Sequence, residues 1–145
     1  MKILLAYDGS ELSEKAKDYA AKMGGGNEIT VLSVDDTRVT HPLGPADYSS
    51  ALGQDTVKKM EEKKMKAFQE AAEKATADLK DKGINAAPRV ERGHAAQTIC
   101  KIAREGNYDM IVMGNRGLGG VKQLLLGSVS NHVVQCTEKT VVIVK

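Results

Sequence analysis

The sequence predicts an α/β fold in which an open, doubly wound sheet of five parallel strands carries helices on both faces. Two observations predict this class. Five short apolar runs recur along the chain, and helical patterns alternate with them, as expected when helices cover a parallel sheet. A third observation, the length of 145 residues, fits a single domain over residues 1–145, because such a chain can bury a sizeable core.

The apolar runs predict the strands. The first begins at the N-terminus and is interrupted by Asp8, and the last, from Val141 to Val144, is hydrophobic without a break. We expect strands at Lys2 to Tyr7, Glu28 to Val34, Ile84 to Val90, Asp109 to Met113 and Thr140 to Val144.

The intervening segments predict helices at Ser10 to Met23, Gln54 to Lys82, Ala95 to Gly106 and Ser128 to Cys136. In the first, Ser10 can cap the start and Gly24-Gly25-Gly26 can stop the end. The second has apolar residues at steps near three and four: Val57, Met60, Ala67, Phe68, Ala71, Ala75 and Leu79. Its opposite charges four residues apart indicate a solvated face: Glu62 and Lys66, Glu70 and Lys74, Asp78 and Lys82.

Right-handed crossovers then allow the strand order 3-2-1-4-5. In such a sheet the chain reverses its direction of winding between the first and fourth strands. Ligands of open α/β sheets bind beyond the carboxyl ends of the strands at this switch point. Asp8 follows the first of these strands, and a glycine-rich segment follows the other.

Composition excludes several classes of partner. The net charge is only +2, with no basic stripe, and aromatic residues are 3% of the chain, so we expect neither nucleic-acid nor membrane binding. No run is long enough to span a membrane, and the apolar start is too short for a signal peptide. We therefore expect a soluble, cytoplasmic protein.

Cys100 and Cys136 lie in helical apolar patterns without metal-ligand spacing, which favours buried thiols in a reducing compartment.

The motif richest in information is Gly114-x2-Gly117-x9-Gly127-Ser128, which follows a predicted strand and precedes a predicted helix. Glycines let backbone N–H groups approach an anion or adopt a positive φ, and a helix start offers unsatisfied donors. We interpret the segment as a phosphate cradle; the alternative is an ordinary loop.

Three side chains near this motif have two interpretations each. Asp8 is a candidate ligand-contacting carboxylate or a helix cap, and Arg116 is a phosphate partner or an exposed loop arginine. Ser128 can contact phosphate or cap the last helix, and Ser130 offers a second hydroxyl.

The segment from Asp35 to Gly53 has no clear period and contains two prolines, and loops of this length are often functional lids. Asp35 and Asp36 could hold a cation, although an acidic pair at a strand end is often a solvated loop. The chain has neither a Walker-type phosphate loop nor a dinucleotide fingerprint after the first strand. Its three histidines, His41, His94 and His132, show no catalytic spacing, and no catalytic residue is assigned.

With these residues the chain resembles the universal stress protein family along its whole length. The glycine motif is similar to the family's nucleotide motif, Asp8 to its first-strand aspartate, and Gly127-Ser128-Val129-Ser130 to its last helix start. Because every motif glycine is present, the resemblance is to the ATP-binding branch. Thr140 stands where the family often has proline.

The resemblance implies an adenine nucleotide site for ATP, with Mg²⁺ as a possible companion held through Asp8 and the phosphates. Val34 would meet the base with its backbone and side chain, although by pattern alone it is a core valine. Carried over by position, the ATP-binding residues are Ala6, Tyr7, Asp8, Val34, Met113, Gly114, Arg116, Gly117, Gly127, Ser128 and Val129. The resemblance also implies a role in stress responses and a homodimer.

Three functions remain in competition at this point. The first is a regulatory switch that binds ATP and orders the loop from Asp35 to Gly53 over it. The second is a slow ATPase or self-phosphorylating enzyme using the same pocket, and the third is a flavodoxin-like domain sharing only the architecture. The unbroken strand Val141 to Val144 predicts a homodimer, since an exposed edge is a template for pairing; the alternative is shielding by the protein's own helices.

Overall fold

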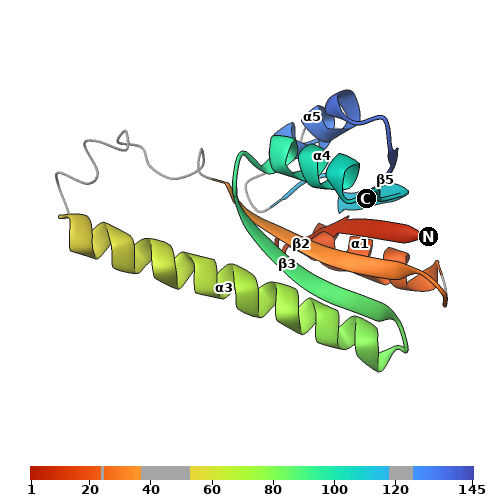
Figure 1. Cartoon of the computed structure of the whole chain (residues 1–145), viewed down its shortest axis with the longest axis horizontal. Coiled ribbons are helices and arrows are strands. Elements are labelled where there is room, and N and C mark those ends of the chain that lie inside the picture. Colours follow the sequence, from red (N-terminus) through yellow and green to blue (C-terminus); the bar gives the residue numbers. More distant parts are fainter. Residues whose placement is uncertain (24, 37–52, 118–125) are drawn as a thin grey trace.

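The computed structural model describes residues 1–23, 25–36, 53–117 and 126–145 and, within them, a five-stranded parallel sheet between two layers of helices (Figure 1). The elements in chain order are β1 (Lys2–Ala6), α1 (Glu11–Lys22), β2 (Glu28–Asp36), α3 (Gln54–Asp81), β3 (Asn85–Gly93), α4 (Ala95–Glu105), β4 (Met110–Gly114), α5 (Ser128–Cys136) and β5 (Thr140–Val144). All pairings are parallel and the strand order is β3-β2-β1-β4-β5. The predicted fold class and strand order are confirmed.

The central strand explains why the sheet forms. Ile3, Leu4 and Leu5 of β1 are completely buried, as expected for a strand covered on both faces. At the carboxyl end of β1, Ala6 lies opposite Met113 of β4. The switch point of the sheet therefore lies between these two strands, where the sequence predicted it.

Alternate residues of the strands supply two separate cores. Ile3 and Leu5 face α1 and α3, where they pack with residues such as Leu79. Leu4 and Leu32 face α4 and α5, and Val133 of α5 packs there. The period of two along the central strands thus directs successive side chains to alternate helical layers.

The long helix α3 is buried only over its second half. Its buried residues are Ala72, Ala75, Thr76 and Leu79, whereas Met60 is 50% exposed and Ala67 is also exposed. Met60 and Ala67 therefore follow the apolar period of the helix without lying in the core. Twenty-eight helical residues span about 42 Å, but the nine residues of β2 span only about 30 Å. The N-terminal half of α3 consequently extends past the sheet (Figure 1).

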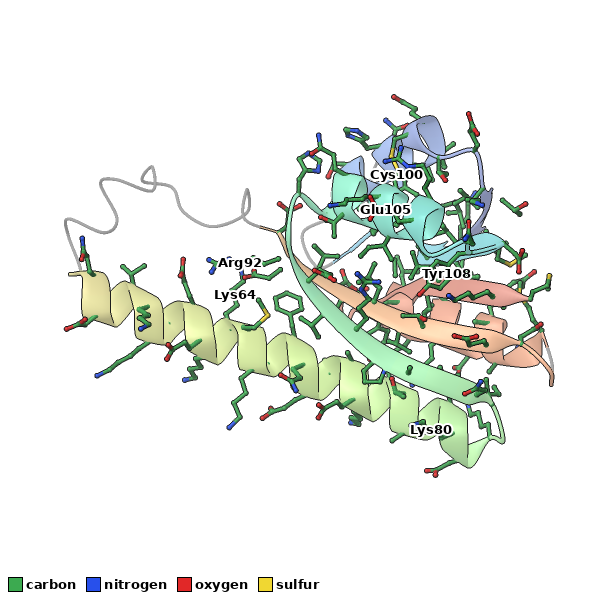
Figure 2. All side chains as sticks on the ribbon, viewed as in Figure 1. Lys64, Lys80, Arg92, Cys100, Glu105 and Tyr108 are labelled. Carbon is green, nitrogen blue, oxygen red and sulfur yellow. A yellow bond between two sulfur atoms is a disulfide. The ribbon has the colours of Figure 1, made fainter. Side chains whose placement is uncertain are left out.

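Ion pairs connect both halves of α3 to neighbouring elements. Near its N-terminal half, Lys64 Nζ lies 2.5 Å from Oδ1 of the buried Asp35, and Arg92 Nε lies 3.7 Å from its Oδ2. Figure 2 shows Lys64 and Arg92 in the space between α3 and the ends of β2 and β3. The charged network therefore holds the helix where the apolar core no longer reaches it.

Near the C-terminal half, Lys17 of α1 is only 4% exposed, and its Nζ lies 2.7 Å from Glu14 Oε2 and 2.8 Å from Asp78 Oδ2. Burial acts to lower the pKa of Lys17, but the two carboxylates outweigh it and raise this pKa. Asp78 was expected to pair with Lys82 on the solvent face; instead it joins α3 to α1, and Lys82 pairs with Asp18.

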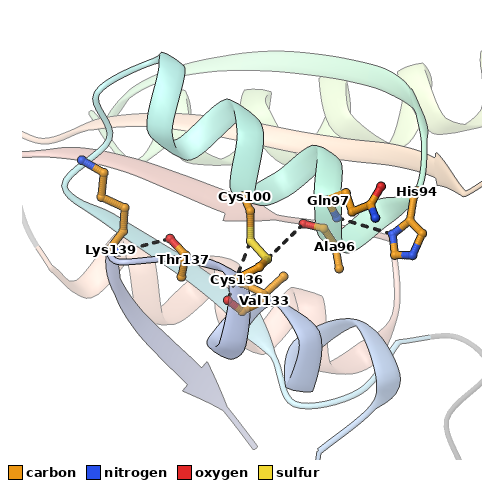
Figure 3. Close-up of a disulfide and its surroundings, with 8 residues drawn as sticks. All are labelled: His94, Ala96, Gln97, Cys100, Val133, Cys136, Thr137 and Lys139. Atoms are coloured by element: carbon orange, nitrogen blue, oxygen red, sulfur yellow. Dashed lines mark hydrogen bonds between the residues drawn. A yellow bond between two sulfur atoms is a disulfide. The ribbon is translucent and has the colours of Figure 1, made fainter.

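The two cysteines form a disulfide, which contradicts the expectation of buried free thiols. Cys100 of α4 and Cys136 of α5 are bonded, with their Cα atoms 6.3 Å apart (Figure 3). Cys136 is also exposed rather than buried. No pattern in the sequence indicates this pairing, because the two residues are 36 positions apart and meet only when α4 packs on α5.

In the described segments of the chain, no helix is both long enough and apolar enough to cross a membrane.

Candidate functional site

Two loops meet at the switch point of the sheet. One follows β1 and carries Asp8; the other follows β4 and carries Asn115, Arg116 and Gly117. Parallel strands direct all their carboxyl ends to the same edge, so the neighbouring strands β1 and β4 bring the two loops together.

Gly117 touches the loop that follows β1. A Cβ atom added at Gly117 would lie 2.5 Å from Asp8 Oδ2, closer than any side chain can approach. The other carboxylate oxygen, Asp8 Oδ1, accepts a hydrogen bond of 3.0 Å from the Ser10 backbone N–H. Ser10 in turn caps α1, as predicted, because its Oγ accepts from the Ser13 N–H. Asp8 is thus held at the start of α1 with one oxygen directed to Gly117.

Gly114 has a packing role. A Cβ added there would lie 2.9 Å from Leu12 Cβ and 3.0 Å from the Leu12 carbonyl carbon, so this glycine lets α1 approach the end of β4. None of Gly114, Gly117 and Gly127 has a positive φ. Of the two reasons for glycine in the sequence analysis, positive φ is therefore wrong at these positions, and close approach to neighbouring atoms is the one that the structure supports.

Asn115 organises the loop, although sequence reasoning missed it. It is 4% exposed, its N–H donates to Val144 O at 2.8 Å, and its carbonyl oxygen accepts from Gly127 N–H and from Ser130 Oγ, both at 2.7 Å. These bonds join the end of β4 to β5 and to the start of α5. The signal available in the sequence was a small polar residue inside the glycine motif, directly after the strand.

The start of α5 lacks a side-chain cap. Gly127 is the N-cap residue, with φ −73° and ψ 167°, and forms no side-chain capping bond. Ser128 is the first helical residue and is exposed, so the reading of Ser128 as the cap is wrong. The hydroxyl of Ser130 is used internally, donating to the carbonyl oxygens of Asn115 and Gly127. First-turn N–H groups and the positive end of the helix dipole are what an anion needs.

Arg116 brings a positive charge to this helix start. A Cβ on Gly127 would lie 3.3 Å from Arg116 Cα, so the two residues are in contact. Arg116 is half-buried, and within the described residues its Nε has no hydrogen-bond partner. A buried guanidinium nitrogen without a partner is costly, and an anionic ligand would satisfy it.

Four predicted apolar residues gather on the α4 and α5 side of the sheet. Ala6, Val34, Met113 and Val129 all belong to, or pack against, the core cluster of that face. They provide an apolar wall on the face of the sheet that carries α5.

Tyr7 does not join this wall. Its ring is buried on the opposite face, against α1 and α3, and its hydroxyl donates to Glu14. Burial, followed by this hydrogen bond, raises the pKa of Tyr7. Its backbone is also occupied, since Tyr7 N–H donates to Leu32 O and its carbonyl accepts from Ser33 Oγ. Tyr7 is therefore the predicted site residue that the structure separates from the others.

The acidic pair at the end of β2 is divided between the two faces of the sheet. Asp35 is buried with Lys64 and Arg92, and Asp36 Oδ2 accepts from Ala95 N–H at the start of α4. Both residues belong to β2, so the reading as solvated loop is wrong, and their separate partners give no support to a shared cation. The rest of the predicted lid, residues 37–52, and motif residues 118–125 lie outside the described residues.

Fold and site together define a doubly wound α/β protein with a glycine-lined loop and an uncapped helix start at its switch point. The family model described as "Universal stress protein family" matches residues 1–145. The chain belongs to this family.

Individual relatives agree with this assignment. The chain is 34% identical to universal stress protein YxiE of Bacillus subtilis over 99% of its own length and 98% of that protein. It is similar to the structure of protein MJ0577, which is known from Methanocaldococcus jannaschii, with a TM-score of 0.78, 27% identity and coverage of 99% and 94%. A universal stress protein of Archaeoglobus fulgidus, solved in complex with dAMP, has the same fold at 19% identity, with a TM-score of 0.64 and coverage of 100% and 98%.

Proposed function

We propose that this chain is a single nucleotide-binding domain that binds ATP at the switch point and acts as a regulatory switch in stress responses. The observation that carries the proposal is the uncapped start of α5 lying beside Arg116 and the motif glycines. The structure of a family member in complex with dAMP supports an adenine nucleotide as the ligand. The composition and the family support a cytoplasmic location.

The chemistry of each group suggests its role. The apolar wall formed by Ala6, Val34, Met113 and Val129 suits the adenine ring. Gly114 would keep α1 close to the wall. Gly117 and Ser128 would offer backbone N–H groups to the ribose and phosphates, Ser128 also a hydroxyl and Arg116 a guanidinium. Gly127, whose own N–H donates to Asn115 O, would contribute by leaving room beside Arg116. Tyr7 would contribute only through its backbone position.

A divalent cation would reconcile Asp8 with a polyphosphate. Its carboxylate is held against Gly117, so phosphates entering the cradle would meet a negative charge there. Mg²⁺ bound to the phosphates would turn this repulsion into attraction, because carboxylate and phosphate oxygens are its preferred ligands. We therefore expect ATP to bind more tightly with Mg²⁺ than without it.

The geometry favours binding over turnover. The Ser130 hydroxyl donates to two carbonyl oxygens and is not poised as a phosphate acceptor, which leaves the Asp8 carboxylate as the candidate base. A single-turnover assay with labelled ATP distinguishes the two functions. Product formed at a rate abolished by Asp8→Ala would establish the slow enzyme in place of the switch.

The binding test is titration calorimetry with ATP, with and without Mg²⁺, after any co-purified nucleotide has been removed. Arg116→Met should weaken binding by roughly tenfold or more, because charge-assisted hydrogen bonds contribute about 1.5–3 kcal/mol. Arg104→Met, which removes an exposed arginine from the last turn of α4, is the matched control and should bind normally. An empty, folded wild-type protein that binds no ATP would reject the proposal.

The edge strand β5 supports the proposed homodimer. Val141 to Val144 are half-buried within one chain, and antiparallel pairing with a second copy would cover the open side of the strand. Light scattering at low micromolar concentration should give twice the chain mass. A monomer mass there would reject pairing through β5.

A further inference from the structure

The disulfide between α4 and α5 connects two helices on the same face of the sheet. Cys100 lies in the middle of α4, and Cys136 is the last residue of α5 (Figure 3). The opposite end of the same helix, Gly127 and Ser128, forms part of the candidate nucleotide site. Cys136 and Ser128 are eight positions apart, or about 12 Å along a helix.

Apart from this bond, few buried residues attach α5 to the rest of the protein. Within its nine residues only Ser130 and Val133 are buried, and helices shorter than about 12 residues are marginal unless packing supports them. Ser130 fastens the first turn through hydrogen bonds, and Val133 packs in the middle. Val129 also packs against the core of this face, and the His132 ring lies 5.4 Å from that of His94. The disulfide adds a covalent link at the last residue of the helix, so breaking it should loosen the C-terminal end of α5.

The surroundings of the two cysteines suit both reduction of the disulfide and the thiols that reduction leaves. Cys136 is exposed, whereas Cys100 is partly covered, so Cys136 is the more accessible residue of the pair. The carbonyl oxygen of Val133 lies 3.8 Å from Cys100 Sγ, and that of Ala96 lies 3.9 Å from Cys136 Sγ (Figure 3). Each sulfur therefore has an acceptor in place once reduction gives it a proton.

We propose that Cys100 and Cys136 form a reversible thiol–disulfide pair whose oxidation state sets the nucleotide affinity; this inference rests on the proposed function. In the oxidised form the disulfide holds α5 against α4 and keeps its first-turn N–H groups in place around the phosphates. In the reduced form α5 moves more freely, and the nucleotide must order it on binding, which weakens the affinity.

The co-reactant is a dithiol. One of its thiolates attacks Cys136 Sγ, forms a mixed disulfide and releases Cys100 as a thiolate, which takes up a proton. The second thiolate of the reductant then attacks the reductant's other sulfur, which is bonded to Cys136 Sγ, and releases Cys136 as a thiolate that also takes up a proton. Two electrons pass to the protein, and the dithiol leaves as a disulfide. In a cytoplasmic protein this reaction is expected, since disulfides there are usually transient and redox-sensing.

The experiment uses the wild-type protein in two states. One sample is oxidised with a disulfide reagent and the other is reduced with a dithiol, and thiol counting by mass confirms each state. Calorimetry with Mg-ATP should show a Kd about three- to tenfold higher for the reduced protein. Cys100→Ser/Cys136→Ser is the control: it should bind like the reduced protein and show no response to the dithiol.

Hydrogen exchange supplies a readout that does not depend on ATP. Amides of α5 should exchange faster after reduction, whereas those of α1, on the other face of the sheet, should not change. Equal exchange of α5 in both states, an unchanged Kd, or failure of the disulfide to form under oxidant would each overturn the inference. If neither state binds ATP, the proposed function fails, and exchange in α5 alone then decides whether the disulfide controls the helix.

Discussion

Two glycines three residues apart in one motif should respond to the same substitution differently, one in stability and the other in ligand binding. A methyl group at Gly114 would lie 2.9–3.1 Å from Leu12 Cβ and the Leu12 backbone, which the whole of α1 holds in place. A methyl group at Gly117 would lie 2.5 Å from the carboxylate of Asp8, which can rotate away. Gly114→Ala should therefore affect stability, and Gly117→Ala should affect ligand binding.

The magnitude follows from these contacts. Overpacking against backbone costs about 1–3 kcal/mol, and replacing a glycine of negative φ by alanine returns about 0.4–1 kcal/mol through the unfolded chain. The net destabilisation by Gly114→Ala is then roughly 1–2 kcal/mol, which lowers the Tm by about 3–8 °C for a chain of this size. Gly117→Ala puts at risk the hydrogen bond from Ser10 N–H to Asp8, which contributes about 0.5–1.5 kcal/mol. The same return of about 0.4–1 kcal/mol through the unfolded chain offsets this cost, so the net change in the free energy of unfolding should be less than about 1 kcal/mol.

Thermal and urea unfolding followed by circular dichroism measure the first effect, and calorimetry with Mg-ATP measures the second. Gly117→Ala should weaken ATP several-fold, because the displaced carboxylate enters the space assigned to the phosphates. Gly114→Ala should retain most of its affinity at a temperature where it is folded. The reasoning is refuted if Gly114→Ala unfolds like the wild type, or if Gly117→Ala is the less stable of the two.

Two further perturbations test the interactions that hold the helices. The pKa of Glu14 is lowered, since hydrogen bonds from Lys17 and Tyr7 outweigh the effect of burial, and the Lys17 hydrogen bond lowers the pKa of Asp78. Stability from these carboxylates is present above their unfolded pKa of about 4 and is lost as the pH falls through the lower folded values. In Lys17→Met the free energy of unfolding, measured with urea, should therefore fall less steeply below this pH than in the wild type. The same pH dependence in both proteins would contradict the assignment. Reducing the disulfide should lower the free energy of unfolding by about 3–4 kcal/mol, as expected for its closed loop. An unchanged urea midpoint after reduction would show that the bond constrains little.

Local patterns were enough to predict the sheet and its order. Apolar runs such as Ile3 to Leu5 exclude solvent on both faces, and a chain that alternates such runs with amphipathic helices has few ways to bury them. The position of the candidate site followed as well, because the carboxyl ends of β1 and β4 meet wherever this order is adopted.

Contacts between distant residues could be decided only by the tertiary structure. The pairing of Lys17 with Asp78, and of Cys100 with Cys136, depends on how helices far apart in the sequence face one another. The exposure of Met60 has the same origin, since the periodicity of α3 is regular but the strands beneath it are too short to cover its first half.

In the glycine motif, some properties could be predicted from the sequence and others were decided only by the tertiary structure. Its spacing by itself indicated a tight loop before a helix and therefore a candidate anion site. Which neighbour each glycine accommodates, Leu12 for Gly114 and Asp8 for Gly117, was set by the packing of α1 and its loop against the end of β4. Sequence periodicity indicates which side of an element faces solvent and which faces the core. A close contact depends on two segments, and only the folded chain brings them together.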